Sequence, residues 1–248
     1  MEQANHSYVI ETDNTGLVSE HGRAVMEAVR FEQWFRGFDR PVLYRMQSDT
    51  SPIQGGEIPV GSVDWVQEVS GTKISPLNLP ESCIKEPFVK RGTCFRTDRA
   101  GLEQELTKHT LFIKSDTGAK VWPALITQNI REVPEDERYF CSTAANFLEE
   151  WRAFVFGGVI LDVKQYAGSW GCPLTEKEVQ YIRDTISLAA LPLPAYTVDI
   201  GRSEYGMEWI EVHPFISCGL YGFDDPSNIL RMTNAAWKYH LKQQKGDS

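Results

Sequence analysis

The most constraining feature of the sequence is a pair of alternating segments near its C-terminal end. Residues 196–200 and 207–213 each alternate apolar and polar side chains, which is the period of half-buried β-strands. A short turn with glycine at both ends, GRSEYG, joins them. We therefore predict a hairpin, and a turn of this size would bring Asp199 near Glu211 on neighbouring strands.

The two acidic residues of this hairpin suggest a metal. Carboxylates that converge on one face repel each other unless a positive charge lies between them. Mg²⁺ suits that position, because it takes carboxylate oxygens and keeps water or phosphate oxygens for its other ligands. Alternation also predicts that Trp209 shares a face with Glu211 and His213. Spacing alone leaves a second interpretation, in which the acidic residues face solvent.

The chain as a whole has the composition of a globular protein. It has 248 residues, of which 42% are hydrophobic and 24% charged. The sequence contains no apolar run of about 18 residues, and its first 14 residues lack the features of a signal peptide. The five cysteines are odd in number and form no CxxC, which favours reduced thiols and a cytoplasmic location. The net charge of −9 argues against broad electrostatic binding to nucleic acid or an anionic membrane.

The first part of the chain has the pattern of a small α/β unit. Residues 8–11 and 41–46 are predicted strands, and residues 18–37 a helix. Residues 60–69 alternate, with Trp65 on the apolar face. This alternation predicts a further strand.

A proline-rich connection follows this unit. Pro76, Pro80 and Pro87 lie close together, and proline resists both helix and central strand. We therefore predict two domains, residues 1–85 and residues 86–248.

The second part mixes strands and helices. Besides the hairpin of residues 196–200 and 207–213, the predicted strands are 110–114, 121–127, 139–143, 149–156 and 159–166. The predicted helices are 102–109, 173–190 and 226–242. Gly157 and Gly158 are a strong two-residue turn signal, so the two strands beside them are predicted to pair. Thr175 and Glu178 match a capping box.

Three cations lie on predicted strands rather than on helix faces. Lys114 ends a strand and precedes a small-residue loop that contains Gly118, and Arg152 and Lys164 lie on the two strands of a hairpin. Phosphates would explain them, because lysine supplies a point charge and arginine a bidentate fork. Alternatively, they are edge-strand charges that discourage association between sheets.

The order of these features resembles the ATP-grasp superfamily of carboxylate–amine ligases, and in particular the clade named for two arginines and one lysine. The segments that carry the resemblance are IPVGSVDWV (58–66), FIKSD (112–116), EWRAFVFGGVILDVKQY (150–166), AYTVDIG (195–201), WIEVHPFISCGLYG (209–222) and the terminal helix with Trp237. The resemblance covers roughly residues 86–240. It implies an α+β fold in which two subdomains grip a nucleotide, preceded by a small N-terminal α/β domain.

The resemblance also implies roles for the cations. Lys114 matches a lysine that contacts ATP phosphates, and Gly118 lies in a loop that folds over them and would allow close backbone approach. Arg152 matches an arginine near the γ-phosphate and the acyl-phosphate. Lys164 resembles a further cation on the phosphate or substrate side. Residues 142–149 resemble the hinge that holds adenine.

Asp199 and Glu211 match the two Mg²⁺ carboxylates of the family. This chain departs from the usual Glu-x-Asn pattern, because it has Glu211-Val-His213. Either His213 is a ligand and admits a softer metal such as Mn²⁺, or water takes its place. Reduced activity is a third alternative. Upstream, where the superfamily often has another phosphate contact, Lys90 and Arg91 are interpreted as a solvated charge cluster.

The activity implied by the resemblance is ATP-dependent ligation. A small-molecule or peptide carboxylate would be joined to an amine through an acyl-phosphate, with release of ADP and phosphate. The alternatives are a nucleotide-binding module without ligase activity and a structural or partner-binding protein without a nucleotide site.

Overall fold

The computed structural model describes residues 6–37 and 40–246. Residues 1–5, which belong to the segment from which no signal peptide is expected, lie outside the described residues. The chain forms two compact units. The first unit is Met1–Ile74, Leu193–Ala195 and Pro214–Ser248, and the second unit is Ser75–Pro192 and Tyr196–His213. This division differs from the predicted domains 1–85 and 86–248, because the segment Pro214–Ser248 belongs to the same unit as Met1–Ile74.

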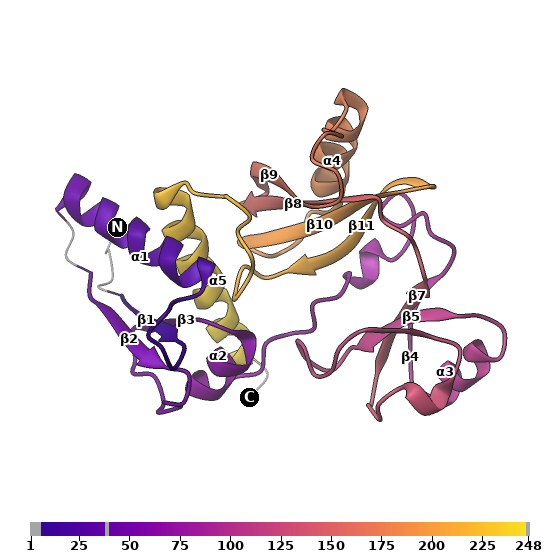
Figure 1. Ribbon diagram of the computed structural model, residues 1–248, viewed down its shortest axis with the longest axis horizontal. Helices are drawn as coiled ribbons and strands as arrows, with labels where there is room; N and C mark the ends of the chain where they lie inside the picture. The colour runs from indigo at the N-terminus through magenta and orange to yellow at the C-terminus, as the bar shows by residue number, and fades with distance from the viewer. Residues whose placement is uncertain (1–5, 38–39, 247–248) are drawn as a thin grey trace. The chain divides into compact units, whose positions relative to one another are not determined.

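The first unit is built on a three-stranded parallel sheet of order β2-β1-β3. Its elements are β1 (Ser7–Thr12), α1 (Glu20–Arg36), β2 (Val42–Met46), β3 (Glu57–Val60), α2 (Val63–Ser70) and α5 (Pro226–Gly246). The helices α1 and α5 pack beside each other (Figure 1). Ser19 begins α1 by accepting a hydrogen bond from the Gly22 N–H, and Gly37 ends it in the left-handed conformation.

The strand predicted over 60–69 is wrong, because most of this segment is the helix Val63–Ser70. The Ser62 side chain caps its first turn, and Gly71 ends it with a left-handed φ of 64°. The buried valines include Val66 and recur every third residue, so they form one helical face and do not follow a period of two.

The second unit contains two four-stranded sheets. The first sheet has the order β4-β7-β5-β6 and the second has the order β11-β10-β8-β9. The elements of the first sheet are β4 (Cys94–Thr97), α3 (Arg99–Leu106), β5 (Leu111–Ser115), β6 (Leu125–Thr127) and β7 (Tyr139–Thr143). The elements of the second are β8 (Glu149–Phe156), β9 (Val159–Ala167), α4 (Glu176–Ala189), β10 (Ala195–Ser203) and β11 (Gly206–His213).

Most predicted elements of the second unit are confirmed. The strand predicted over 121–127 is shorter than expected and comprises only Leu125–Thr127. Gly157 and Gly158 both have positive φ, as a two-residue hairpin turn requires. The capping box of Thr175 and Glu178 begins α4.

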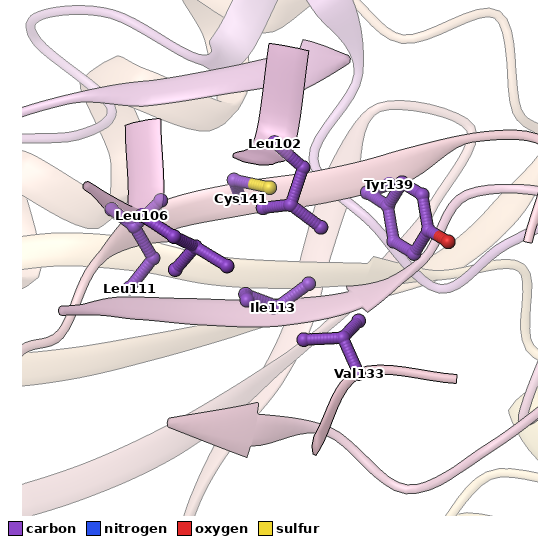
Figure 2. Close-up of a cluster of buried hydrophobic side chains, with 7 residues drawn as sticks. All are labelled: Leu102, Leu106, Leu111, Ile113, Val133, Tyr139 and Cys141. Carbon is purple, nitrogen blue, oxygen red and sulfur yellow. The ribbon is translucent and has the colours of Figure 1, made fainter. Parts of the chain in front are cut away.

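A buried cluster behind the first sheet orients β5. Figure 2 shows the side chains of this cluster, which are Leu102, Leu106, Leu111, Ile113, Val133, Tyr139 and Cys141. Leu111 and Ile113 of β5 point into this core, so the strand period places Lys114 on the opposite face. The core therefore fixes the direction of a candidate site residue.

Within residues 6–37 and 40–246, no helix is long and apolar enough to cross a membrane. The cysteines are free thiols, namely Cys83, Cys94, Cys141, Cys172 and Cys218. A cytoplasmic location stays a prediction.

Candidate functional site

The hairpin of β10 and β11 brings Asp199 directly opposite Glu211, as predicted. A β-bulge follows this pair, so Ile200 lies opposite Trp209. A bulge inserts one residue, and a shift of one residue reverses the face of each later side chain. The prediction that Trp209 shares a face with Glu211 is therefore wrong. Instead, the Trp209 indole N–H donates to Thr185 Oγ1 on α4 at 3.0 Å, on the other side of the sheet.

Asp199 is held by Arg152 of the neighbouring strand β8. The Arg152 Nε and Nη2 atoms donate to Asp199 Oδ1 and Oδ2, each at 2.6 Å. Both residues are buried, with 5% and 4% of their surface exposed. Burial raises the pKa of Asp199, the Arg152 guanidinium opposes this shift, and the Glu211 carboxylate adds to it. The geometry is the bidentate fork that arginine forms with planar anions.

Glu211 is paired with a cation from the first sheet. Lys114 Nζ lies 3.0 Å from Glu211 Oε2, and it also donates to the Leu77 carbonyl oxygen. The ammonium lies over the Phe140 ring, 5.7 Å from its centroid. Since Lys114 is on β5 and Glu211 on β11, this ion pair joins the two sheets of the second unit.

Lys164 lies directly opposite Arg152 in the β8–β9 hairpin, and residues paired across strands share a face. Its ammonium pairs with Asp162 Oδ2 at 2.9 Å. The strand β9 is at the edge of its sheet, so the interpretation of Lys164 as an edge-strand charge fits this position equally well.

Tyr166 joins this face, and the sequence reasoning did not single it out. Its hydroxyl donates to Glu150 Oε2 at 2.6 Å, and its ring lies against the Arg152 guanidinium, 5.6 Å from centroid to carbon. Burial raises the pKa of Tyr166, and Asp199 and Glu150 add to the shift. The sequence did contain a signal for Tyr166, because it lies two residues after Lys164 and is therefore expected on the same face of the strand.

His213 is buried on the Glu211 side of β11 and lies opposite Thr197. Among the described residues, no group of three or more His, Cys, Asp or Glu side chains is arranged to hold a metal ion. Mg²⁺ usually keeps several waters and uses one or two carboxylates together with substrate phosphates. The carboxylate oxygens of Asp199 and Glu211 therefore fit Mg²⁺ without a third protein ligand.

The loop after β5 borders a pocket of about 360 Å³. Lys114, Gly118 and Glu211 line this pocket. The beginning of the loop is tied down, because the buried Asp116 carboxylate accepts hydrogen bonds from Arg96 at 3.0 Å and from Arg138 at 2.9 Å. Gly118 thus lies beside Lys114 in the pocket, whereas the interpretation of its loop as a flexible cover stays a prediction.

The connection between β7 and β8, which corresponds to the predicted hinge, is anchored by Phe147. A Cβ atom at Gly201 would overlap the Phe147 ring, so glycine is required for this close approach. The Leu148 N–H donates to the Arg202 carbonyl oxygen at 2.8 Å. These contacts fix the path of the connection along β10.

Arg91 differs from its predicted role as a solvated charge. It is 3% exposed, and its Nη1 atom lies 3.1 Å from Oε2 of the buried Glu208. Its guanidinium also lies over the Phe147 ring at 5.5 Å. The Lys90 N–H donates to the same Glu208 oxygen at 3.1 Å. Lys90 and Arg91 thus join the segment before β4 to β11.

A comparison with protein families identifies the family of the chain. The sequence model that matches residues 48–233 describes an ATP-grasp domain, family 3 of the clade named for two arginines and one lysine. The chain belongs to this clade of ATP-grasp domains. No curated protein sequence matches it.

Solved structures agree with an ATP-grasp fold. D-alanine–D-alanine ligase from Bacillus anthracis is 11% identical with a TM-score of 0.50, and the match covers 96% of this chain and 99% of that one. A RimK domain ATP-grasp protein from Sphaerobacter thermophilus is 9% identical with a TM-score of 0.52 and coverages of 93% and 97%. D-cycloserine synthetase is 10% identical with a TM-score of 0.52 and coverages of 94% and 99%. The ATP-grasp fold predicted from the sequence is confirmed.

Proposed function

We propose that this ATP-grasp protein is an ATP-dependent ligase that joins a carboxylate to an amine. The observation that carries the proposal is the direct pairing of Asp199 with Glu211, each beside a cation that reaches it from another strand. This arrangement supplies hard oxygen ligands and positive charges in one place, which is what a metal-bound triphosphate needs. Membership of this clade of ATP-grasp domains supports the same activity.

The reaction would have two steps. A carboxylate oxygen of the substrate attacks the γ-phosphorus of ATP, the bond between the β- and γ-phosphates breaks, and ADP leaves. The amine then attacks the acyl carbon, the carbon–oxygen bond to phosphate breaks, and the amine nitrogen releases a proton to water. The protein contributes in-line positioning and neutralisation of charge rather than a covalent bond.

The residues divide these tasks. Lys114 would hold the phosphates of ATP, and Arg152 would stabilise the charge that develops on the transferred phosphoryl group. Lys164, opposite Arg152, would hold a phosphate or substrate oxygen. Asp199 and Glu211 would hold Mg²⁺, which when bound neutralises phosphate oxygens. Mn²⁺ would be accepted if His213 were a ligand.

One observation favours a second candidate, a nucleotide-binding module without ligase activity. Two nitrogens of the Arg152 guanidinium, Nε and Nη2, donate to Asp199. In addition, β11 has His213 where the family usually has asparagine. If Arg152 stayed paired with Asp199 after nucleotide binding, the site would bind ATP but would not supply the Arg152 charge to the transferred phosphoryl group.

A screen of amino acids and peptides for ADP and phosphate release in the presence of Mg-ATP tests the ligase. Amine-dependent release of ADP, lost in Glu211→Gln, supports the proposal. Thermal stabilisation by Mg-ATP without ADP release for any carboxylate and amine supports the nucleotide-binding module. If Mg-ATP shifts neither the melting temperature nor the tryptophan fluorescence, both candidates are wrong.

A further inference from the structure

We propose that the first unit carries a separate binding site, a groove along α1 that binds a basic segment of another polypeptide. The groove consists of a pocket, lined by residues that include Glu20 and Asp224, and of an exposed aromatic surface formed by Phe31, Trp34 and Phe35. Its occupant is an extended peptide in which a lysine or arginine and an apolar side chain are four positions apart. The proposal goes beyond the ligase activity and uses no residue assigned to the nucleotide.

The pocket lies within the first unit, between α1 and the chain that leads into α5. Its volume is about 210 Å³, below the range of about 300–1,000 Å³ that is typical of small-molecule sites. It therefore suits one long side chain better than a whole cofactor. The buried part of its lining is apolar and consists of Ala28, Leu220, Phe223 and Ile229.

The exposed part of the lining is charged and mostly acidic. Glu20, Glu27 and Asp224 contribute carboxylates, and Arg23 contributes a guanidinium, which gives a net charge of −2. Within residues 6–37 and 40–246, none of these four side chains forms an ion pair. Lysine and arginine complement both parts of the lining, because they combine an aliphatic stem with a positive end.

The two sides of the pocket are joined before any ligand arrives. The Leu220 N–H donates to Glu20 Oε2 at 3.3 Å, and Ser227 Oγ donates to Glu32 Oε1 at 3.1 Å. Both hydrogen bonds connect α1 with the segment that carries the other side of the pocket. A site that is already ordered binds without the cost of arranging its own loops.

The aromatic surface continues this side of α1 toward the end of the helix. Phe31, Trp34 and Phe35 are 36%, 80% and 64% exposed. Their rings contact one another, with centroids 5.6–6.3 Å apart. Glu27 of the pocket precedes Phe31 by four residues, so the two side chains are neighbours on the helix surface. Contiguous exposed apolar groups of this kind mark interaction sites.

The charge of the groove decides between a second copy of the chain and a different partner. The chain has a net charge of −9, and the pocket itself is acidic. Two copies that met through this groove would place like charges together, whereas a basic segment would be attracted to it. A basic partner is therefore favoured over self-association.

The helix sets the spacing of the two anchors in the partner. Glu27 and Phe35 are eight residues apart on α1, which corresponds to a rise of about 12 Å. An extended peptide advances by about 3.3 Å per residue, so about four residues cover this distance. The positive side chain would enter the pocket, and the apolar side chain would lie on the aromatic surface.

Fluorescence polarisation with the full chain and a labelled, end-capped peptide tests the proposal. The probe has lysine and leucine separated by three glycine or serine residues. It should bind at least tenfold more tightly than two matched peptides, one with glutamate in place of lysine and one with serine in place of leucine. Equal binding by the lysine and glutamate peptides, or no binding at millimolar protein, would overturn the proposal.

Variants at exposed positions assign this binding to the groove. Glu27→Gln and Trp34→Ser should each weaken binding of the probe at least fivefold. Glu68→Gln, at an exposed carboxylate of α2 in the same unit, and Trp170→Ser, at a side chain that is 91% exposed, are the matched controls and should bind like the parent. Glu27→Lys should remove the preference for lysine over glutamate, a change that a folding defect would not produce.

Two results with these variants would contradict the proposal. One is binding by Glu27→Gln and Trp34→Ser that equals binding by their controls. The other is a dimer, detected by light scattering and dispersed by Trp34→Ser, which would assign the aromatic surface to a second copy of the chain. None of these measurements contains Mg-ATP, so their outcome leaves the proposed ligase function to its own test.

Discussion

Glu211 lies directly opposite Asp199 across the β10–β11 hairpin, yet the two carboxylates form ion pairs with different cations. Lys114 reaches Glu211 from the first sheet, and Arg152 reaches Asp199 from β8. Each cation compensates the repulsion that two adjacent carboxylates would otherwise create. When a divalent cation binds the two carboxylates, Lys114 and Arg152 would be free to bind phosphate oxygens.

Glu211→Gln should abolish Mg²⁺-dependent nucleotide binding with little change in stability. Its side chain is 24% exposed, so the loss of its ion pair with Lys114 should cost below about 1 kcal/mol. Asp199→Asn should also abolish binding, but it leaves the buried Arg152 charge without its carboxylate and should lower the free energy of unfolding by about 3–5 kcal/mol. Urea unfolding and AMPPNP titration measure both effects, and full Mg²⁺-dependent binding by the two variants would refute the metal assignment.

Lys114→Ala should weaken ATP binding by about 1.5–3 kcal/mol, the range for hydrogen bonds to charged groups. The change removes the only direct link that we assign between β5 and the phosphates. Lys177→Ala, on the exposed side of α4, is the control and should bind ATP like the parent. An affinity for Lys114→Ala that equals the control would remove this lysine from the site.

Sequence periodicity predicted the strands that carry Lys114, Asp199 and Glu211, because strands with one buried face follow a strict alternation. The short turn predicted that Asp199 lies near Glu211, and the roles of these residues came from the family resemblance.

Periodicity failed at Trp209, since a bulge reverses the faces after Asp199, and no residue type marks that bulge. It also failed at Trp65, because Val63, Trp65 and Val69 fit a period of two, whereas the buried Val66 fits only a helical face.

The ion pairs were beyond the reach of sequence reasoning for a different reason. Arg152 and Asp199 are 47 residues apart, and their contact depends on the strand order β10-β8. Arg91 looked like a surface charge because its partner Glu208 follows it by 117 residues. Long-range pairing of this kind is set by tertiary topology and leaves no local pattern.

His21 should make the stability of the first unit depend on pH. Burial lowers the pKa of His21 to about 4, and its ring packs against Phe215 at 5.6 Å between centroids. Because the unfolded chain binds the proton more readily, stability should be constant above about pH 6.5 and fall by about 3 kcal/mol as the pH falls to 4. His21→Leu should flatten this part of a urea-unfolding profile, whereas His109→Gln, at an exposed imidazole, should not. A parent profile that is flat between pH 6.5 and 4 would contradict the prediction.

Glu178 should make the free energy of unfolding depend on pH in a more acidic range than His21 does. Hydrogen bonds from Arg202 lower the pKa of Glu178 to about 2, and its capping contacts with Thr175 add to the shift. Its contribution is therefore complete above about pH 4.5 and is lost as the pH falls toward 2. Glu178→Gln should reduce the free energy of unfolding at pH 7 by about 1.5–3 kcal/mol and remove this acid-dependent part. Glu176→Gln, an exposed neighbour in the same turn, is the control, and an equal effect in both variants would argue against the Arg202 pair.

Gly201→Ala should disturb the predicted hinge without touching a charged residue. The new Cβ would overlap the Phe147 ring, so the ring and the connection it anchors must move. Such overpacking costs about 1–3 kcal/mol of stability.

Gly201→Ala should also weaken nucleotide binding, because it displaces the connection between β7 and β8, and residues 142–149 are proposed to hold adenine. We expect an affinity loss of at least about fivefold, measured by AMPPNP titration. Gly171→Ala is the matched control, since its Cβ would meet only Ser169 Oγ at 3.7 Å. Adding Phe147→Leu to Gly201→Ala should recover part of both losses, because the smaller side chain leaves room for the Cβ. A variant that loses stability but binds AMPPNP normally would place adenine elsewhere than on this connection.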